Sequence, residues 1–364
     1  IQCCLVGSEM CIRDRRDENQ IFPKDEIKKM GELGFMGIMV PEEWGGSGLD
    51  TISYIIALEE IAAVELATST IMSVNNSLVC QVLLDWGTDA QKSKFLNPIA
   101  SGSKLGAYSL SEPQSGSDAS NMKTFAEKNG NNFIVNGTKN WVTSGENCDL
   151  IIFFCKTEKG AGSKGISAFI IEKGTPGLTT GKKEEKLGIR ASDTCELYFD
   201  NCVIPASNLI GSLGQGFSIA MQALGGGRIG IASQSVGLAR SALDKTISYS
   251  QEREQFGKII AKFGAIQNKI ADMATNIEAA RLLVMQAAIL KDQGKEYIKE
   301  SSMAKLFASS TAMSAATECV QVHGGYGYMQ EYGVERLMRD AKITEIYEGT
   351  SEIQRLVISR ELLK

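Results

Sequence analysis

The sequence predicts a multidomain α+β protein in which a β domain lies between two helical regions. Residues 24–101 carry apolar side chains at helical spacing, for example Ile27, Met30 and Leu33. Residues 104–214 carry short β-type runs bounded by turn residues instead. From Gly216 the helical period returns in long, alanine-rich segments. This order differs from the alternating strands and helices of a doubly wound sheet. No GxGxxG motif follows a predicted strand, so a Rossmann dinucleotide site has no support.

The first fifteen residues, IQCCLVGSEMCIRDR, show no amphipathic period and contain three of the nine cysteines. No basic segment precedes their short apolar run, so they do not resemble a signal peptide. We expect residues 1–15 to be a non-native leader such as translated adapter sequence, the alternative being a disordered native tail. The native chain then begins near Arg16 and lacks a first helix.

We expect a helical domain over residues 16–103. The glycine-rich segment PEEWGGSG at 41–48 predicts a loop within it, because glycine and proline disfavour a helix interior. A helix over residues 90–100 is expected to stop near Pro98.

We expect the middle β domain over residues 104–214. Strands are predicted at 104–111, 150–155, 165–171 and 195–199. Residues 133–135 and 138–142 flank Asn136-Gly137, a pair that favours a type I′ turn, so a hairpin is expected there.

Residues 215–364 predict an antiparallel helix bundle, because their helices are long and their links short and polar. Helices are expected from Phe217 onward, at 263–290, at 296–322 and after Ser351. The GGGR sequence at 225–228 falls inside the first of these helices, so it is not a phosphate-binding loop.

Composition excludes several classes of protein. The chain has 38 Lys and Arg against 43 Asp and Glu, so no basic surface dominates and no nucleic-acid partner is expected. A single histidine, His323, disfavours zinc sites and a Ser-His-Asp triad, and no metal is expected. Nine cysteines without CxxC spacing indicate reduced thiols. No unbroken apolar run reaches the roughly 18 residues of a membrane span.

Two segments of the β domain carry groups suited to a flat polar ligand. The segment 108–118 leaves a strand and enters a loop rich in hydroxyl groups. Trp141 and Thr143, at i and i+2 of a strand end, point to one side of a regular strand and could cover and hydrogen-bond a ring. Taken singly, each also fits an ordinary loop or a core tryptophan.

Three segments of the bundle add to this pattern. Arg253 could bind a phosphate and Phe256 could stack on a base. The glycines of 321–328 let backbone amides approach a ligand closely. Glu348 precedes a Gly-Thr-Ser helix start. Each also fits a solvated loop or a helix end, and it is their occurrence together in this order that is specific.

Five motifs, YSLSEPQSGSD, WVTSG, REQFGK, QVHGGYGY and IYEGTSEIQR, resemble those of the acyl-CoA dehydrogenase family. The likeness covers residues 16–364 and is strongest to the short-chain (butyryl-CoA) branch. It implies a helical N-terminal domain, a β-barrel-like middle domain and a C-terminal four-helix bundle. It further implies FAD as cofactor, a homotetramer built from dimers, and an electron-transferring flavoprotein as acceptor. The implied reaction is oxidation of an acyl-CoA thioester to the trans-2-enoyl-CoA.

The resemblance also implies roles for individual residues. Glu348 resembles the catalytic base that removes the α-proton while a hydride passes to flavin N5. Implied FAD contacts are Tyr108, Leu110, Ser111, Trp141, Thr143, Arg253, Phe256, Gln321, Gly325, Thr350 and Glu352. Implied substrate contacts are Ser117, Arg228 and Gly349. The contacts at 253, 256, 321 and 325 resemble a pyrophosphate and adenine site shared across the dimer interface.

The chain departs from the family at two positions. Gly225 stands where an Asp is often found, and Gly264 where a Gln is common, which affects one CoA contact and one adenine contact. Some branches place the base on the long helix, where Gly227 of this chain cannot act, and this favours Glu348.

Two alternatives stay open: an acyl-CoA oxidase that passes electrons to oxygen, and a catalytically silent FAD-binding protein. We expect a cytoplasmic location in a bacterium or the matrix in a mitochondrion, with the bacterial cytoplasm favoured.

Overall fold

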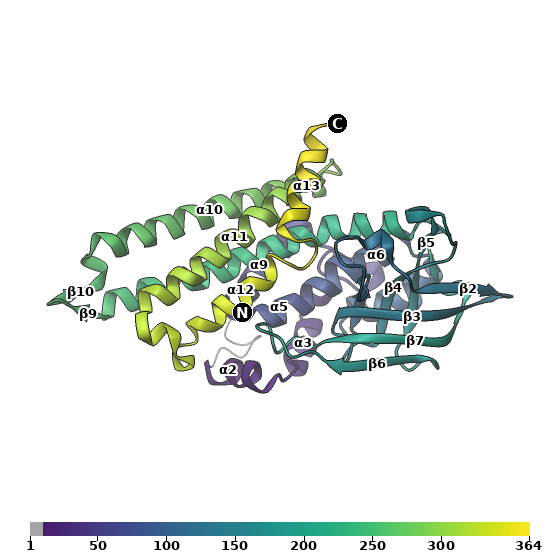
Figure 1. Cartoon of the computed structure of the whole chain (residues 1–364), viewed down its shortest axis with the longest axis horizontal. Helices are drawn as coiled ribbons and strands as arrows, with labels where there is room; N and C mark the ends of the chain where they lie inside the picture. Colours follow the sequence, from purple (N-terminus) through teal and green to yellow (C-terminus); the bar gives the residue numbers. More distant parts are fainter. Residues whose placement is uncertain (1–9) are drawn as a thin grey trace.

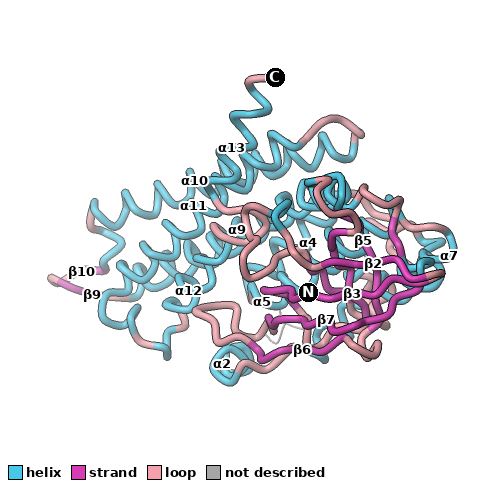
Figure 2. Tube along the Cα trace, turned by 45° about the vertical axis from the view of Figure 1, so that its right-hand side comes forward, coloured by secondary structure: helices cyan, strands magenta, loops and turns pink. Residues whose placement is uncertain are grey.

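The structure, a computed structural model, describes residues 10–364. Helices fill one end of the molecule and a twisted sheet the other, with the N-terminal helices between them (Figure 1). The same segregation of helix and strand is visible in Figure 2. The predicted α-β-α order is therefore confirmed.

The N-terminal region consists of short helices. They are α2 (Met10–Asn19), α3 (Lys24–Glu32), α4 (Thr51–Val64), α5 (Leu66–Ser73), the π-helical segment η3 (Val74–Cys80), α6 (Gln81–Trp86), α7 (Asp89–Gln91), η4 (Lys92–Leu96) and α8 (Asn97–Ala100). Asp50 caps α4 by accepting a hydrogen bond from the Ser53 amide at 2.8 Å. The helix expected over residues 90–100 is confirmed, and it ends at Ala100, two residues after Pro98. Pro98 lies in the first turn of α8, where its missing N–H costs little.

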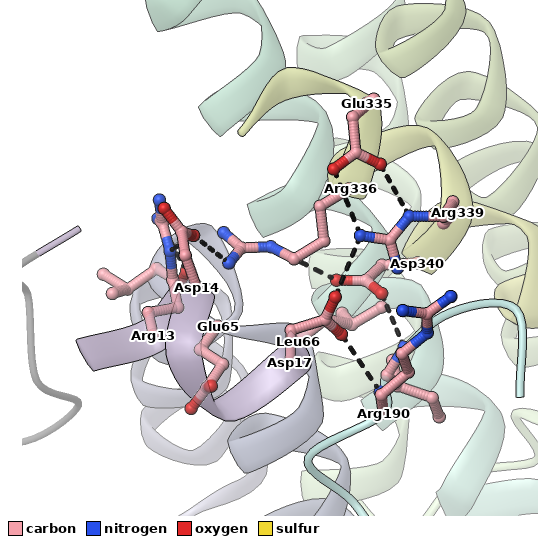
Figure 3. Close-up of polar contacts among 12 residues, drawn as sticks. Arg13, Asp14, Asp17, Glu65, Leu66, Arg190, Glu335, Arg336, Arg339 and Asp340 are labelled. Carbon is pink, nitrogen blue, oxygen red and sulfur yellow. Dashed lines mark hydrogen bonds and ion pairs between the residues drawn. The ribbon is translucent and has the colours of Figure 1, made fainter. Parts of the chain in front are cut away.

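We expected residues 1–15 to be a non-native leader. Residues 1–9 of this segment lie outside the part of the chain that the structure describes. From Met10 onward the chain forms helix α2, which packs against α12 (Val334–Thr344). Arg336 pairs with Asp14 and Arg339 with Asp17 (Figure 3). The buried Arg13 also donates to the carbonyl of Val64. Unlike a leader outside the fold, the described residues 10–15 belong to a helix held by these complementary charges.

The middle region is an eight-stranded sheet. Its strands are β1 (Gly106–Ser109), β2 (Phe125–Asn129), β3 (Asn132–Thr143), β4 (Leu150–Lys156), β5 (Ile166–Glu172), β6 (Leu178–Lys183), β7 (Thr194–Pro205) and β8 (Leu209–Ile210). The order is β6-β7-β3-β2-β4-β5-β8, with β1 parallel to β4. Buried aromatic and branched side chains fill its two faces.

The hairpin expected at Asn136-Gly137 is wrong, because β3 runs unbroken through these residues. The register with β7 shifts between Val135 and Gly137, which marks a bulge. Gly137 is needed there for space, since a Cβ atom would lie 2.4 Å from Thr124 Oγ1. The hairpin turn lies instead at Gly130-Asn131, between β2 and β3.

The C-terminal region is a bundle of long helices. They are α9 (Gly216–Glu252), α10 (Gly264–Asp292), α11 (Ile298–His323), α12 and α13 (Ser351–Leu362). A small hairpin, β9 (Glu254–Gln255) and β10 (Lys258–Ile259), joins α9 to α10. Buried alanines such as Ala304, Ala308 and Ala312 let α11 lie close to its neighbours. The sequence did not predict α12, which leads directly to residue 348.

Within residues 10–364 one helix, α10, has the length and apolar composition of a membrane-crossing helix. Its best 18-residue window has a mean hydropathy of 1.2 and is 33% buried. Charged residues such as Glu278 and Arg281 interrupt its apolar sequence. In the fold α10 packs against α9 and α11.

Candidate active site

Glu348 lies in the turn between α12 and α13, at the seam between the bundle and the N-terminal helices. Its φ is 51° and that of Gly349 is 95°, so two successive residues adopt left-handed backbone. For a non-glycine residue this conformation costs on the order of 1 kcal/mol and persists only where surrounding contacts impose it.

Three side chains hold this turn. Lys305 on α11 donates to the Gly349 carbonyl at 2.8 Å. Gln354 donates to the same carbonyl at 2.8 Å and approaches the carbonyl of Glu348 at 3.2 Å. Thr350 caps α13 by accepting from the Ile353 amide at 3.4 Å. The backbone of residue 348 is therefore fixed from both the bundle and the following helix.

The carboxyl group of Glu348 lies against Gly227 of α9. A Cβ atom at residue 227 would lie 1.9 Å from Glu348 Oε2 and 3.0 Å from Leu78 Cδ2. Oε2 is buried and accepts no hydrogen bond from the described residues. Burial raises the pKa of Glu348 to about 7, although the charges of Lys305 and Arg228 act to lower it. A carboxyl with this pKa is suited to accept a proton near neutral pH.

Two buried cations accompany Glu348. Arg228 on α9 donates to Ser302 Oγ at 3.3 Å, and its Nε has no partner among the described residues. Burial lowers the pKa of Lys305 to about 8, with the charge of Glu348 acting in the opposite direction. Both charges favour the ionised form of Glu348, so they offset part of its desolvation. Lys305 and Gln354 were not among the residues identified from the sequence. The sequence does contain one signal for Lys305, which is the single lysine in the helical segment SSMAKLFASS, otherwise rich in small residues.

The sheet brings Tyr108 to the same region. Its ring lies 5.1 Å from that of Phe154, and its buried hydroxyl has no hydrogen-bond partner within residues 10–364. Burial, and secondarily the charge of Glu348, raises the pKa of Tyr108. Tyr108, on β1, therefore lies within range of the charge of Glu348, which comes from the α12–α13 turn.

The loop after β1 is fastened to β3 by a buried ion pair. Lys139 Nζ lies 2.8 Å from Glu112 Oε1, with side chains 0% and 2% exposed, and donates to the Leu110 carbonyl at 3.0 Å. The Ser111 carbonyl accepts from the Asn140 amide at 2.9 Å. Leu110 and Ser111 are therefore held beside the end of β3 that carries Trp141.

Trp141 is 61% exposed and has a φ of 60°, where the register between β3 and β7 shifts. The regular alternation assumed for Trp141 and Thr143 is therefore interrupted at the tryptophan. Thr143 ends β3 and pairs with Thr194.

A second group of predicted residues lies far from Glu348 within one chain. Arg253 and Gly325 line a cavity of about 550 Å³ with Tyr249, His323 and Tyr326. The guanidinium of Arg253 lies 5.4 Å from the centre of the Tyr326 ring. Arg253 follows Arg228 by 25 residues of sequence along α9, which is roughly 38 Å at about 1.5 Å per residue. The structure therefore does not bring this group to Glu348 within one chain.

The remaining predicted residues are exposed. Phe256 is 92% exposed at the tip of the β9–β10 hairpin and contacts Phe263 edge-on. Gln321 is exposed on α11 and does not line the cavity. Ser117 lies in the exposed loop after β1, and Glu352 in the exposed first turn of α13.

Near the end of the sheet, three buried hydroxyls find no hydrogen-bond partner in the part of the chain that the structure describes: Tyr108 Oη, Ser109 Oγ and Ser144 Oγ. Unpartnered buried polar atoms are rare in native proteins and suit a polar ligand. These groups, with the exposed Trp141 ring nearby in sequence, fit the edge of a flat heterocycle such as a flavin. Among residues 10–364 no group of His, Cys, Asp and Glu is arranged to hold a metal ion.

Hydroxyls without partners among the described residues at the end of the sheet, and a buried carboxyl at the edge of the helix bundle, fit an oxidoreductase that binds a flat cofactor. The family models for the N-terminal, middle and C-terminal domains of acyl-CoA dehydrogenase match residues 9–103, 107–202 and 214–363. The chain belongs to the acyl-CoA dehydrogenase family, and the resemblance drawn from its motifs is confirmed.

Individual relatives agree over nearly the whole chain. The short-chain specific mitochondrial acyl-CoA dehydrogenase of Rattus norvegicus is 50% identical over 96% of this chain and 84% of its own length. The solved butyryl-CoA dehydrogenase of Megasphaera elsdenii is 46% identical, covers 99% of this chain and 94% of its own, and has a TM-score of 0.96. A chain solved in a study of the electron-transferring flavoprotein of Acidaminococcus fermentans is 50% identical over 96% of this chain and 92% of its own, with a TM-score of 0.95.

Proposed function

We propose that this chain oxidises short-chain acyl-CoA thioesters to trans-2-enoyl-CoA with Glu348 as the catalytic base. Members of the family are FAD flavoproteins and acyl-CoA dehydrogenases. The observation that carries the assignment of Glu348 is its buried, unpartnered Oε2, held against Gly227 by a strained turn. An acyl-CoA oxidase is the less favoured alternative, since the relatives reported above are dehydrogenases.

In this proposal Glu348 removes the α-proton of the thioester and becomes neutral. The α-proton is a weak acid, so the base has to be desolvated and aimed, which burial and the left-handed turn both favour. Lys305 and Arg228 keep the carboxyl ionised before the proton arrives, and Gly349 lies beside the substrate. When bound, FAD supplies the acceptor for the hydride that leaves the β-carbon.

We propose that the flavin ring of FAD is bound by five residues at the end of the sheet: Tyr108, Leu110, Ser111, Trp141 and Thr143. The unpartnered hydroxyl of Tyr108 and the fastened loop after β1 support this assignment. Thr350 and Glu352, at the start of α13, are proposed FAD contacts because they adjoin the Glu348 turn. Ser117 and Arg228 are proposed contacts to the CoA side of the substrate.

We propose that Arg253, Phe256, Gln321 and Gly325 serve the FAD of a second copy of the chain. The distance along α9 supports this, because these residues are remote from their own Glu348. The exposed apolar side chains of α10 and α11 also favour an interface: Leu282, Ile289, Met303 and Phe307. A homotetramer built from such dimers is the proposed assembly.

We propose an electron-transferring flavoprotein as the electron acceptor. The similarity to a chain that was solved in a study of such a flavoprotein supports this proposal. We propose the bacterial cytoplasm as location, over the mitochondrial matrix. The six described cysteines are free and buried, which suits either reducing compartment. Domain limits of 16–103, 104–214 and 215–364 are likewise proposed, and the spans of the three family models support them.

The variant Glu348→Gln tests the proposed base. It keeps the shape of the side chain but removes its proton affinity, so FAD should stay bound while bleaching of the flavin by butyryl-CoA under anaerobic conditions is lost. Glu361→Gln, at a half-buried position of α13 where the glutamate pairs with Arg360 and Lys364, is the matched control and should bleach normally. Normal bleaching by the Glu348→Gln protein would disprove the assignment.

A further inference from the structure

The loop between β6 and β7 contacts both sides of the candidate active site. Residues 187–193, called the connecting loop below, join the sheet to α12, the helix that leads to Glu348. Asp340 of α12 accepts a hydrogen bond from the Ile189 amide of this loop. In Figure 3 the Asp340 carboxyl faces the loop beside Arg190. The first attachment of the loop is therefore a side chain of α12.

The connecting loop lies directly against the backbone of α12. A Cβ atom at Gly188 would lie 2.5 Å from the carbonyl oxygen of Arg339. The Arg339 side chain donates to the Leu187 carbonyl at 3.0 Å. Ile189 is buried and has a φ of 43°, a left-handed conformation that is rare for a β-branched residue. Strain of this kind persists only where the surroundings impose it, so the position of the loop on α12 is closely specified.

The other end of the connecting loop holds the turn that follows β3. The buried Asp193 accepts from the Glu146 amide at 2.8 Å and from the side-chain amide of Asn147 at 3.1 Å. Its carbonyl accepts from the Ser144 amide at 2.9 Å. Ser144 directly follows Thr143, a proposed contact of the flavin. The second attachment of the loop is therefore the strand end that carries flavin contacts.

The backbone between α12 and Glu348 is closed by hydrogen bonds. The Tyr347 amide donates to the Ile343 carbonyl at 3.1 Å, and the Ser351 amide donates to the Glu345 carbonyl at 3.0 Å. Because these bonds tie the turn to the end of α12, a displacement of α12 also displaces Glu348.

Asp340 does not occupy a position that favours stability. Its carboxyl is buried and lies 3.9 Å from Arg336 Nε, beyond hydrogen-bond distance. Burial raises the pKa of Asp340 to about 6, with the charge of Arg336 acting in the opposite direction. A carboxyl whose pKa is raised on folding destabilises the fold as the pH rises and the group ionises. What Asp340 does provide is an acceptor for the Ile189 amide.

We propose, on the basis of the function proposed above, that Asp340 is a positioning residue which fixes, through the connecting loop, the distance between Glu348 and the flavin contacts at the end of β3. Asp340 and Asp193 are the two attachments of this loop. Removal of a proton and departure of a hydride need both partners aligned, and small displacements reduce such rates strongly. In this proposal Asp340 contacts neither the substrate nor FAD.

The first test measures reduction of the flavin by butyryl-CoA under anaerobic conditions, on FAD-loaded protein at neutral pH. The dependence of the rate on substrate concentration gives a limiting rate and an apparent Kd separately. Asp340→Leu should lower the limiting rate about tenfold or more. The apparent Kd should change less than about twofold, because substrate contacts are kept. Asp340→Asn keeps an acceptor for the Ile189 amide and should retain most of the rate.

Two further variants separate the loop contact from the other contacts of α12. Gly188→Ala interrupts the same contact from the loop side, because its methyl group would meet the Arg339 carbonyl, and it should slow flavin reduction as Asp340→Leu does. Asp14→Asn removes an ion pair between α2 and Arg336 of α12, so it should keep the wild-type limiting rate. An equal loss in Asp14→Asn would assign the effect to the ion pairs of α12 and overturn the proposal.

A double variant tests whether the two attachments act through one loop. Asp193→Ala releases the turn after β3 and should also lower the limiting rate about tenfold. Independent losses multiply, so Asp340→Leu combined with Asp193→Ala would then be about a hundredfold slower than wild type. If the loop connects them, either change already releases it, and we expect the double variant within about threefold of the slower single variant.

Three results overturn this inference alone: losses that multiply in the double variant, equal losses in Asp340→Leu and Asp340→Asn, or a wild-type limiting rate in both Asp340→Leu and Gly188→Ala with FAD bound. Absence of flavin bleaching by butyryl-CoA in the wild type overturns the proposed function, and the inference with it.

Discussion

The carboxyl of Glu348 occupies the space that a side chain at residue 227 would need, since a Cβ atom on Gly227 would lie 1.9 Å from Glu348 Oε2. One residue on a long helix and one in a turn more than a hundred positions later therefore share a single volume. The carboxyl group can adopt this position only because residue 227 has no side chain.

The variant Gly227→Ala should separate folding from catalysis. Alanine favours the helix by about 1 kcal/mol over glycine, so α9 should still form. The methyl group displaces the Glu348 carboxyl, and the rate of anaerobic flavin reduction by butyryl-CoA should fall about a hundredfold or more. Thermal unfolding monitors the fold. Gly264→Ala, where a Cβ meets open space, is the control; a wild-type rate in Gly227→Ala would show that the carboxyl does not act from this position.

Lys305 should shift the pH dependence of the reaction. Its positive charge lowers the pKa of Glu348, so Lys305→Met should raise that pKa above its value of about 7. The acid limb of the pH profile of kcat/KM then moves to higher pH, and activity at neutral pH declines. Lys305→Arg should restore most of the profile, and Lys299→Met on the same helix should not change it. A profile that does not move in Lys305→Met, with FAD still bound, would contradict this role.

The Glu112–Lys139 pair should determine how firmly FAD is held. Removing one partner leaves a buried charge unpaired, which costs about 3–5 kcal/mol, so Lys139→Met should lower the melting temperature. It also frees the Leu110 carbonyl, so FAD should dissociate more readily. The double variant Glu112→Leu with Lys139→Met should recover much of the stability and little of the FAD retention. Equal recovery of both would mean that the pair acts on stability alone.

Subunit complementation tests the site shared by two copies. Arg253→Ala and Glu348→Gln should each be inactive alone. In a mixed dimer one site receives both intact residues, because Arg253 comes from the copy opposite to Glu348. Co-expression of differently tagged chains should therefore yield mixed dimers with activity. Inactive mixed dimers that retain FAD would place Arg253 and Glu348 on the same copy's site.

The helices and most strands could be predicted because their periodicity is local. The bundle helices, and the strands at 150–155 and 165–171, were found in this way. The turn predicted at Asn136-Gly137 was wrong. Gly137 is a glycine because Thr124 packs too close for a side chain, and this tertiary requirement leaves the same sequence pattern as a turn. Helix α12 was not predicted, although it leads to the turn that carries Glu348.

The sequence was enough to identify most side chains of the candidate site, but not to predict which of them lie close together in space. Glu348 and Tyr108 were both identified, and the structure brings them near each other. Arg253 and Phe256 were identified too, yet they lie at the opposite end of α9. The sequence had no clear signal for Gln354, whose amide matters only because the turn presents two carbonyls to it.

By itself the sequence determined the order of helical, β and helical regions. It also determined that a glutamate, Glu348, precedes a Gly-Thr helix start. Both are properties of neighbouring residues. The tertiary structure alone decided that this carboxylate is buried, that its Oε2 has no hydrogen-bond partner among the described residues, and that the charges of two cations act on it. Those properties depend on Gly227, Arg228 and Lys305, which approach from other helices. Desolvation and charge are set by what surrounds a group in space, and no local pattern along a chain specifies them.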